Sequence, residues 1–285
     1  MLARRQSPKP HAAQAASAPP QVAVSVPPQV VGAPGLASET GESAAQPSVP
    51  RPFAALSRMG GKPRSSTGRV SEAPAGQLIP RAFFEAPAEL VAPRLLGKVL
   101  LHRFADENGA KHLSGRIVEV EAYLGPRNHP PDPAAHTHRG PTPRNQVIFG
   151  PAGHAYVYSI YGKYFCMNVT CEPEGQAGCV LVRALEPLHG ADLMAANRGL
   201  EHGAKPSQLT AGPSRLCQAL GLTRPTHNGL DLTDPASALQ LLDDGYPDAD
   251  AHVTVRIGIR HAVDLPLRFI LRGHPCVSGP RKLRG

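Results

Sequence analysis

Two carboxylates lie two residues apart in an apolar stretch, residues 116–125, which reads RIVEVEAYLG. On a β-strand, side chains alternate between the two faces, so Glu119, Glu121 and Tyr123 would share one face, together with Ile117. Carboxylates about 7 Å apart on one strand face raise at least one pKa, which suits a general base or acid. The alternative is an exposed edge strand whose acidic face is solvated.

A single charged residue, Arg183, interrupts another apolar stretch, residues 179–185 (CVLVRAL). A charge buried on a strand needs a carboxylate partner or a ligand. Candidate partners are Glu119, Glu121 and Glu186. A structural ion pair and a catalytic role both remain open for Arg183.

A polar loop rich in His, Pro and Gly lies between these two stretches. His136 and His138 form an H-x-H pair, but no nearby Cys or H-E-x-x-H motif completes a metal site, so we expect no metal. Either histidine could instead hydrogen-bond a ligand, and we assign no role to His138. Arg144, in the turn TPRN, is a candidate phosphate contact.

Four of the six tyrosines fall within nine residues. The pattern predicts a hairpin whose tip is Tyr161, Gly162 and Lys163. An aromatic side chain at such a tip is costly to leave in water. Wedges that enter a DNA base stack are apolar or aromatic, and a flanking Lys or Arg meets the phosphate. We therefore expect Tyr161 to contact DNA, and we place Tyr156 and Tyr164 in the core.

The chain has 285 residues and a net charge of +8 at pH 7, which is unevenly distributed. Residues 1–76 carry 8 Lys/Arg and 3 Asp/Glu, residues 77–255 carry 15 and 18, and residues 256–285 carry 7 and 1. A basic surplus indicates a polyanionic partner, and the C-terminal block is the more informative source of it. Five cysteines without a C-x-x-C pair argue against a zinc knuckle, a redox pair or a disulfide scaffold.

Residues 1–76 hold 12 Pro, 15 Ala and one aromatic residue, Phe53. Such a segment cannot bury enough apolar surface to offset its ordering entropy, so we predict a disordered tail. An organelle transit peptide is a weaker alternative, because the Pro pairs argue against an amphipathic helix. A basic arm that touches nucleic acid is another. No apolar run reaches the roughly 18 residues of a membrane-spanning helix.

The remaining residues, 77–285, predict one α+β domain on a mostly antiparallel sheet, with hairpins rather than crossovers. The Asn-Gly pair within residues 106–110 predicts a hairpin turn, and the acidic stretch 231–250 is predicted to be turns. Helices are predicted over residues 86–97, 189–197 and 213–220. Strands are predicted over residues 98–104, 116–123, 154–160, 164–170, 179–185, 252–259 and 267–272.

Several of these motifs occur in one order that resembles a known family. They are RIVEVEAYLGP, AAH, TPRNQVIFGPAGHAYVYSIYGKYFCMN, CVLVRALEPLHG, AGPSRLCQALGL, RIGIRHA and LPLRFILRGHPCVS. Together they resemble the alkyladenine (3-methyladenine) DNA glycosylases of the mammalian type, which also occur in bacteria. The resemblance covers roughly residues 78–280, and it implies a single domain on a curved antiparallel sheet with surrounding helices and a protruding β-hairpin.

The resemblance also implies roles for individual residues. Tyr161 matches the hairpin tyrosine that fills the gap left by a flipped nucleotide, and Glu121 matches the general base. Arg183 matches a residue near the catalytic water and the DNA backbone. The residues that match the pocket for the flipped base are Tyr123, His136 and Tyr158, which hold it, and Asn168, which excludes the amino group of guanine.

From these matches we expect a monofunctional base-excision enzyme that removes alkylated, and also deaminated, purines from double-stranded DNA. Arg144 and Lys163 would contact the DNA backbone. We expect no cofactor, no metal, no membrane association and a monomer, in the cytoplasm or nucleoid of a bacterium or in a eukaryotic nucleus or organelle. A binding module without catalysis is one alternative. A glycoside hydrolase using Glu119 and Glu121 is another, which fits poorly because both carboxylates lie on one strand face.

Overall fold

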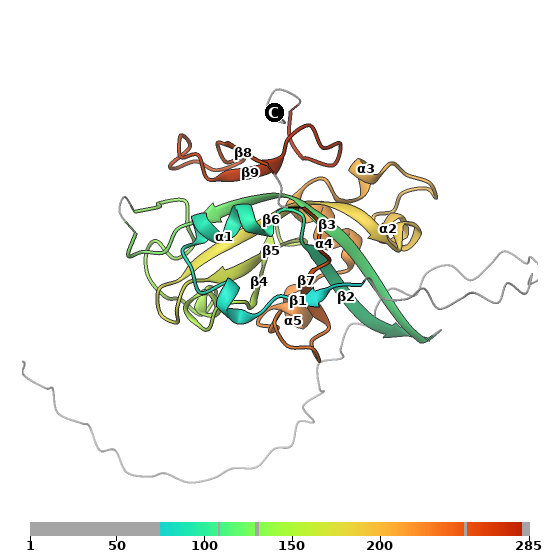
Figure 1. The fold of residues 1–285 in the computed structure, drawn as a ribbon, viewed down its shortest axis with the longest axis horizontal. Coiled ribbons are helices and arrows are strands. Elements are labelled where there is room, and N and C mark those ends of the chain that lie inside the picture. Colours follow the sequence, from blue (N-terminus) through green and yellow to red (C-terminus); the bar gives the residue numbers. More distant parts are fainter. Residues whose placement is uncertain (1–74, 108, 129–130, 248–249, 281–285) are drawn as a thin grey trace, which may run out of the picture. The chain divides into compact units, whose positions relative to one another are not determined.

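The computed structural model describes residues 75–280, except residues 108, 129–130 and 248–249. Its strands form one sheet in which every pairing between strands is antiparallel, so the predicted α+β class is confirmed (Figure 1). The disordered tail predicted for residues 1–76 lies outside the described residues, apart from 75 and 76. The strands are β1 (Gln77–Leu78), β2 (Val99–Asp106), β3 (Gly109–Tyr123), β4 (Ala155–Ile160), β5 (Tyr164–Cys171), β6 (Gly178–His189), β7 (Leu239–Asp243), β8 (Ala251–Thr254) and β9 (Arg268–Leu271).

The longest strand, β3, lies in the middle of the sheet, whose order is β1-β7-β2-β3-β6-β5-β4. One edge of β3 pairs first with β2 and then with β9, and the other edge pairs with β6. β3 is therefore not an edge strand, and Glu119 and Glu121 are fully buried. The alternative of an exposed acidic edge strand is therefore wrong.

Two irregularities interrupt the ladder between β3 and β6 beside the carboxylates. Val118 is left unpaired on β3, and Arg183 is left unpaired on β6. An extra residue in a ladder breaks the alternation of faces, so Ile117 and Val118 both pack into the main core. For this reason the prediction that Ile117 shares the face of Glu119 is wrong.

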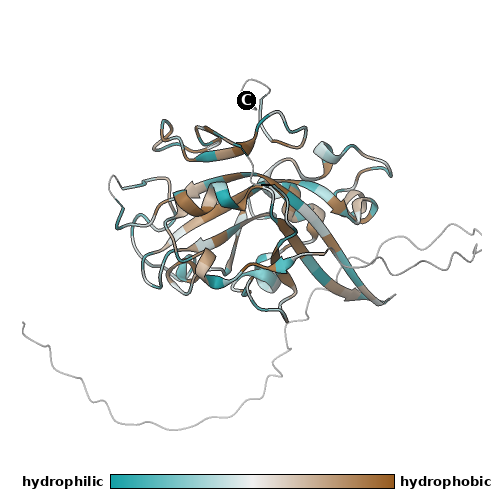
Figure 2. Cartoon of the chain, viewed as in Figure 1, coloured by the Kyte–Doolittle hydropathy of each residue, from teal (hydrophilic) through white to brown (hydrophobic). Residues whose placement is uncertain are grey.

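Short helices pack against the sheet, whose strands carry many of the apolar residues, brown in Figure 2. α1 contacts β3 and β6, and α4 contacts β5 and β6. The predicted helices over 86–97, 189–197 and 213–220 are confirmed as α1, α2 and α4. The helices are α1 (Ala88–Leu95), α2 (Ala191–Asn197), α3 (Pro206–Thr210), α4 (Pro213–Leu220) and α5 (Arg224–His227), with 3-10 turns at Arg81–Phe83 and Gln146–Phe149.

Two sequence predictions near the C-terminal end are corrected. The acidic stretch 231–250 contains β7, which pairs between β1 and β2 and buries its leucines, because pairing with neighbouring strands overrides the flanking turn residues. The strand predicted over 252–259 ends at Thr254. Beyond it, Arg256 pairs with Asp132 and the Ile257 N–H binds Glu121, so the chain leaves the ladder.

The predicted hairpin is confirmed as β4 and β5, joined by Tyr161, Gly162 and Lys163. Tyr161 is 90% exposed and has φ of 50°, a left-handed conformation that is uncommon for a bulky residue and typical of functional sites. Tyr156 is buried, as predicted. The prediction of a core position for Tyr164 is wrong, because it begins β5 beside the exposed tip, where the Lys163 Nζ lies 5.1 Å from the centre of its ring.

Gly125 follows β3 at a close approach to the loop before β6, and a Cβ there would lie 2.3 Å from the backbone oxygen of Gln176. We expect Gly125→Ala to lower the free energy of unfolding by about 1–3 kcal/mol, as overpacking does, in a urea titration. Gly150→Ala is the control, because its Cβ would meet its nearest neighbour at an ordinary 3.4 Å. Equal losses in both variants would contradict the argument.

Candidate active site

A cavity of about 450 Å³ lies between the β4–β5 hairpin and the loop that follows β8. Its volume is in the range of small-molecule sites. Glu121 lies directly behind its wall, and Lys163 lies outside it at the hairpin tip. The predicted site residues that line the cavity are Tyr123, His136, Arg144, Tyr158, Tyr161, Asn168 and Arg183.

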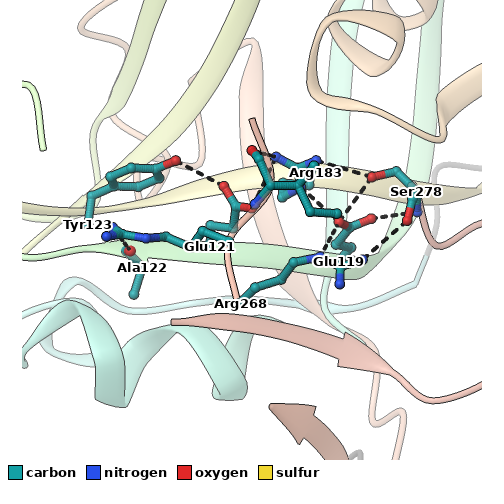
Figure 3. Close-up of polar contacts among 9 residues, drawn as sticks. Glu119, Glu121, Ala122, Tyr123, Arg183, Arg268 and Ser278 are labelled. Atoms are coloured by element: carbon teal, nitrogen blue, oxygen red, sulfur yellow. Dashed lines mark hydrogen bonds and ion pairs between the residues drawn. The ribbon is translucent and has the colours of Figure 1, made fainter. Parts of the chain in front are cut away.

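Glu121 is held by three groups that themselves line the cavity (Figure 3). Its Oε1 accepts a hydrogen bond from the Ile257 N–H at 2.7 Å and lies 3.2 Å from Arg183 Nη1. Its Oε2 accepts from the Tyr123 hydroxyl at 2.9 Å. The carboxylate is thus fixed in place one layer behind the cavity surface.

Glu119 is the anchor of a buried charge network. Its Oε1 accepts from Arg183 Nε at 2.8 Å and from Arg268 Nε at 2.7 Å, and its Oε2 accepts from the Ser278 N–H at 2.6 Å. Burial alone would raise the pKa of Glu119, but the two guanidinium groups outweigh it, so the pKa is lowered. Glu119 is therefore a carboxylate whose acceptor sites are taken up by the protein.

Arg183 lies between the two carboxylates and is 6% exposed. Burial lowers its pKa, but Glu121 and Glu119 more than compensate, so the net shift is upward and the charge is retained. Both carboxylates are confirmed as its partners. Glu186 is not, because it lies instead beside Arg116, 3.9 Å away.

An aromatic wall forms one side of the cavity. The rings of His136 and Tyr158 meet edge to face, with centroids 4.6 Å apart, and Tyr156 stacks behind Tyr158 at 5.5 Å. His136 Nδ1 lies 3.0 Å from the Tyr156 hydroxyl, which fixes the ring. The Arg144 guanidinium lies 5.7 Å from the centre of the Tyr158 ring. Burial raises the pKa of the Tyr158 phenol, which stays neutral.

A buried ion pair that the sequence did not reveal packs beside Tyr123. Arg256 binds both oxygens of Asp132, at 2.6 and 2.8 Å, and its guanidinium lies 4.7 Å from the centre of the Tyr123 ring. Asp132 also accepts from the Leu124 N–H at 3.2 Å. As for Arg183, the sequence signal for Arg256 was a charged residue within an apolar segment. No local pattern indicates that Asp132 is its partner.

The expectation that the C-terminal basic block forms a single polyanion-binding surface therefore needs correction. Arg256 and Arg268 are buried and bind carboxylates of the same chain, because each occupies a core position where an unpaired charge would be costly. Arg260 and Arg272 are exposed. The other basic residues of the block, Arg281, Lys282 and Arg284, lie outside the described residues.

Within the described residues, no group of three or more His, Cys, Asp or Glu side chains is placed to hold a metal ion. The part of the chain that the structure describes also has no helix of the length and apolarity needed to cross a membrane.

The model of the methylpurine-DNA glycosylase family matches residues 82–275. The chain belongs to this family. It is accordingly a DNA-3-methyladenine glycosylase, a DNA-repair hydrolase of N-glycosyl bonds, as its relatives also indicate.

Three relatives carry the provisional name 3-methyladenine DNA glycosylase. One from Koribacter versatilis is 51% identical over 224 residues, which cover 78% of this chain and all of the relative. One from Burkholderia cenocepacia is 46% identical over 205 residues, 72% of this chain and 92% of the relative. One from Methanoculleus marisnigri is 47% identical over 207 residues, 70% and 98% of the two chains.

We expect Glu119→Gln to lower the free energy of unfolding by about 3–5 kcal/mol, because it leaves two buried guanidinium groups without their carboxylate. Asp106→Asn is the control: it breaks an exposed pair with Lys111 and should cost below about 1 kcal/mol.

A comparison of wild type with Glu119→Gln also gives a pH test. A carboxylate with a lowered folded-state pKa stabilises the protein above its ordinary pKa, here 4.5, and this stability is lost as pH falls through the folded value. The gap between wild type and Glu119→Gln should therefore narrow below about pH 4.5 in urea titrations. A gap that stays constant down to acid pH would show that the charge of Glu119 is not what stabilises the fold.

Proposed function

We propose that this enzyme rotates a damaged purine nucleotide out of duplex DNA and hydrolyses its N-glycosidic bond with a water molecule activated by Glu121. One observation supports this above all: a single cavity is lined both by the exposed hairpin tyrosine, Tyr161, and by Arg183, which pairs with Glu121 directly behind the cavity wall. A base inside a duplex cannot reach such a cavity, so it must leave the stack, at a cost of a few kcal/mol.

The hairpin tip is suited to hold the DNA open. Tyr161 would enter the gap left by the flipped nucleotide and restack with the neighbouring bases, which offsets part of the flipping cost. Lys163, exposed beside it, and Arg144, at the cavity edge, would contact phosphates. Because one chain supplies the hairpin tip, the cavity lining and the contacts of Glu121, we propose that the enzyme acts as a monomer. It would act in the compartment that holds the genome.

The aromatic rings that line the cavity would select the base. Electron-poor rings bind aromatic faces best, and alkylated purines such as 3-methyladenine carry positive charge, so Tyr123 and Tyr158 would favour them through cation–π attraction. A charged base is also a good leaving group. Deaminated purines such as hypoxanthine are neutral and would need protonation to leave. Asn168, which also lines the cavity, would exclude the amino group of guanine.

The chemistry needs one free acceptor position on Glu121. A carboxylate has about four lone-pair sites, and the Ile257 N–H, the Tyr123 hydroxyl and Arg183 use three of them. The fourth would accept a proton from the water whose oxygen attacks the sugar carbon, while the bonding pair of the N-glycosidic bond leaves with the purine. No lysine is among the residues that line the cavity, so the product would be an abasic site in an uncut strand.

The two alternatives fit the contacts less well. A glycoside hydrolase would need Glu119 as its second carboxylate, yet two arginines and Ser278 occupy its oxygens. A binding module without catalysis would have no use for a carboxylate beside the cavity.

We expect Glu121→Gln to lower the single-turnover rate of excision by about 10²–10⁴-fold, because the amide cannot take a proton from water. The assay uses duplexes with one hypoxanthine and, separately, methylated DNA, and hot alkali reveals abasic sites. Glu201→Gln, at an exposed position, should match wild type. Full activity of Glu121→Gln would refute its role as the base, and release of methylated purines alone would restrict the substrates to charged ones.

We expect Lys163→Ala to weaken duplex binding and to reduce the slope of log affinity against log salt by about one, because one phosphate contact is lost. Lys205→Ala, an exposed lysine at the start of α3, is the control. Titrations at several salt concentrations would measure both variants. An unchanged affinity and slope for Lys163→Ala would remove Lys163 from the DNA interface.

A further inference from the structure

The side-chain amide of Asn168 is held at both of its polar atoms. Its Nδ2 donates to the backbone oxygen of Tyr156 at 3.3 Å, and its Oδ1 accepts from the thiol of Cys179 at 3.7 Å. Asn168 and Cys179 are 3% and 6% exposed, and both line the cavity. The orientation of this amide is therefore set by groups of the protein itself.

The backbone brings the two side chains together. Asn168 lies on β5, and Cys179, on β6, pairs with Thr170, two residues along β5. Residues two apart on a strand share a face, so Cys179 and Asn168 are diagonal neighbours on one face of the sheet. The sulfur is further fixed by packing in a small apolar cluster with Tyr156 and Ile148.

Cys179 is a donor rather than an acceptor at this place. Burial, reinforced by the charge of Asp132, raises the pKa of the Cys179 thiol to about 12, so the S–H proton stays on the sulfur at neutral pH. A thiol beside the carbonyl end of an amide stabilises one of its two orientations. With Oδ1 toward Cys179 and one N–H toward Tyr156, the second N–H of Asn168 remains for the cavity.

This orientation of the amide would discriminate between purines with and without an amino group at position 2. Guanine carries an amino group at position 2, a donor, which would face the donor N–H of Asn168 and lose its hydrogen bond on entering the cavity. Hypoxanthine has hydrogen at that position and meets no such conflict. A reversed amide would present Oδ1 to the same amino group and accept from it.

We propose that Cys179 is a positioning residue for substrate selection, which orients the Asn168 amide so that it presents a donor to the base and disfavours purines with a 2-amino group. The proposal rests on the proposed function, because it concerns the base that occupies the same cavity.

The test uses two lesions that differ only in the 2-amino group, 7-methylguanine and 7-methylhypoxanthine, placed in the same duplex. Both are charged leaving groups, so the ratio of their single-turnover excision rates isolates the effect of the amino group. Cys179→Ala should shift this ratio by about two- to fivefold in favour of 7-methylguanine, the size expected for one weak hydrogen bond. Cys179→Ser retains a donor and should restore the wild-type ratio.

Cys171→Ala is the matched control. Cys171 is also buried on β5, but its thiol points to the backbone oxygen of Val169 and it does not line the cavity. It should leave the ratio unchanged. An equal fall in both rates for Cys179→Ala, with the ratio constant, would overturn the proposal, because a purely structural role predicts that result.

A second readout needs no DNA. In nuclear magnetic resonance spectra of the free protein, the Asn168 side-chain amide should show slow proton exchange, and Cys179→Ala should speed it while Cys179→Ser and Cys171→Ala do not. Unchanged exchange in Cys179→Ala would also overturn the proposal. If wild type released neither lesion, the proposed function would fail, and the amide signal alone would decide whether Cys179 orients Asn168.

Discussion

The fold around the candidate active site depends on one buried carboxylate. Glu119 binds Arg183 of β6, Arg268 of β9 and the backbone of Ser278, and so connects the central strand to residues that lie 64, 149 and 159 positions further along the chain. A charge that is removed from solvent is costly unless it has a partner. Loss of any one charged member of this network would therefore leave another buried charge without one of its partners. Because Arg183 is fixed by Glu119, it can hold Glu121 behind the cavity wall.

Irregular strand pairing makes part of this arrangement possible. The ladder between β3 and β6 leaves Val118 unpaired on one strand and Arg183 on the other, beside Glu119. Bulges are frequent next to active sites because they re-aim a side chain at little cost to the rest of the sheet. Here they free Arg183 to serve two carboxylates, while Val118 still packs in the core.

The sequence predicted those features of the fold that a local pattern of residues determines. Strands with alternating or continuous apolar residues and the helix beginning at Pro213 were found. Residue type singled out Tyr161 and the pair Glu119 and Glu121, and the family resemblance then indicated Glu121. What it missed joins distant segments: the Arg256–Asp132 pair spans 124 positions and the Ser278–Glu119 contact spans 159. The bulge at Val118 was missed for the same reason, since it exists only relative to β6.

The balance of charges bears on the proposed cationic substrate, because a buried arginine also lines the cavity. Glu119 and Glu121 together neutralise Arg183 and Arg268, so the network carries no net charge beneath the cavity. Arg268 does not line the cavity, whereas the Tyr123 and Ile257 contacts of Glu121 do. Glu121 thus contacts residues of the cavity wall directly, and electrostatic interactions weaken with distance. Under the proposed function, this arrangement would let Glu121 both attract a charged purine and accept a proton from water.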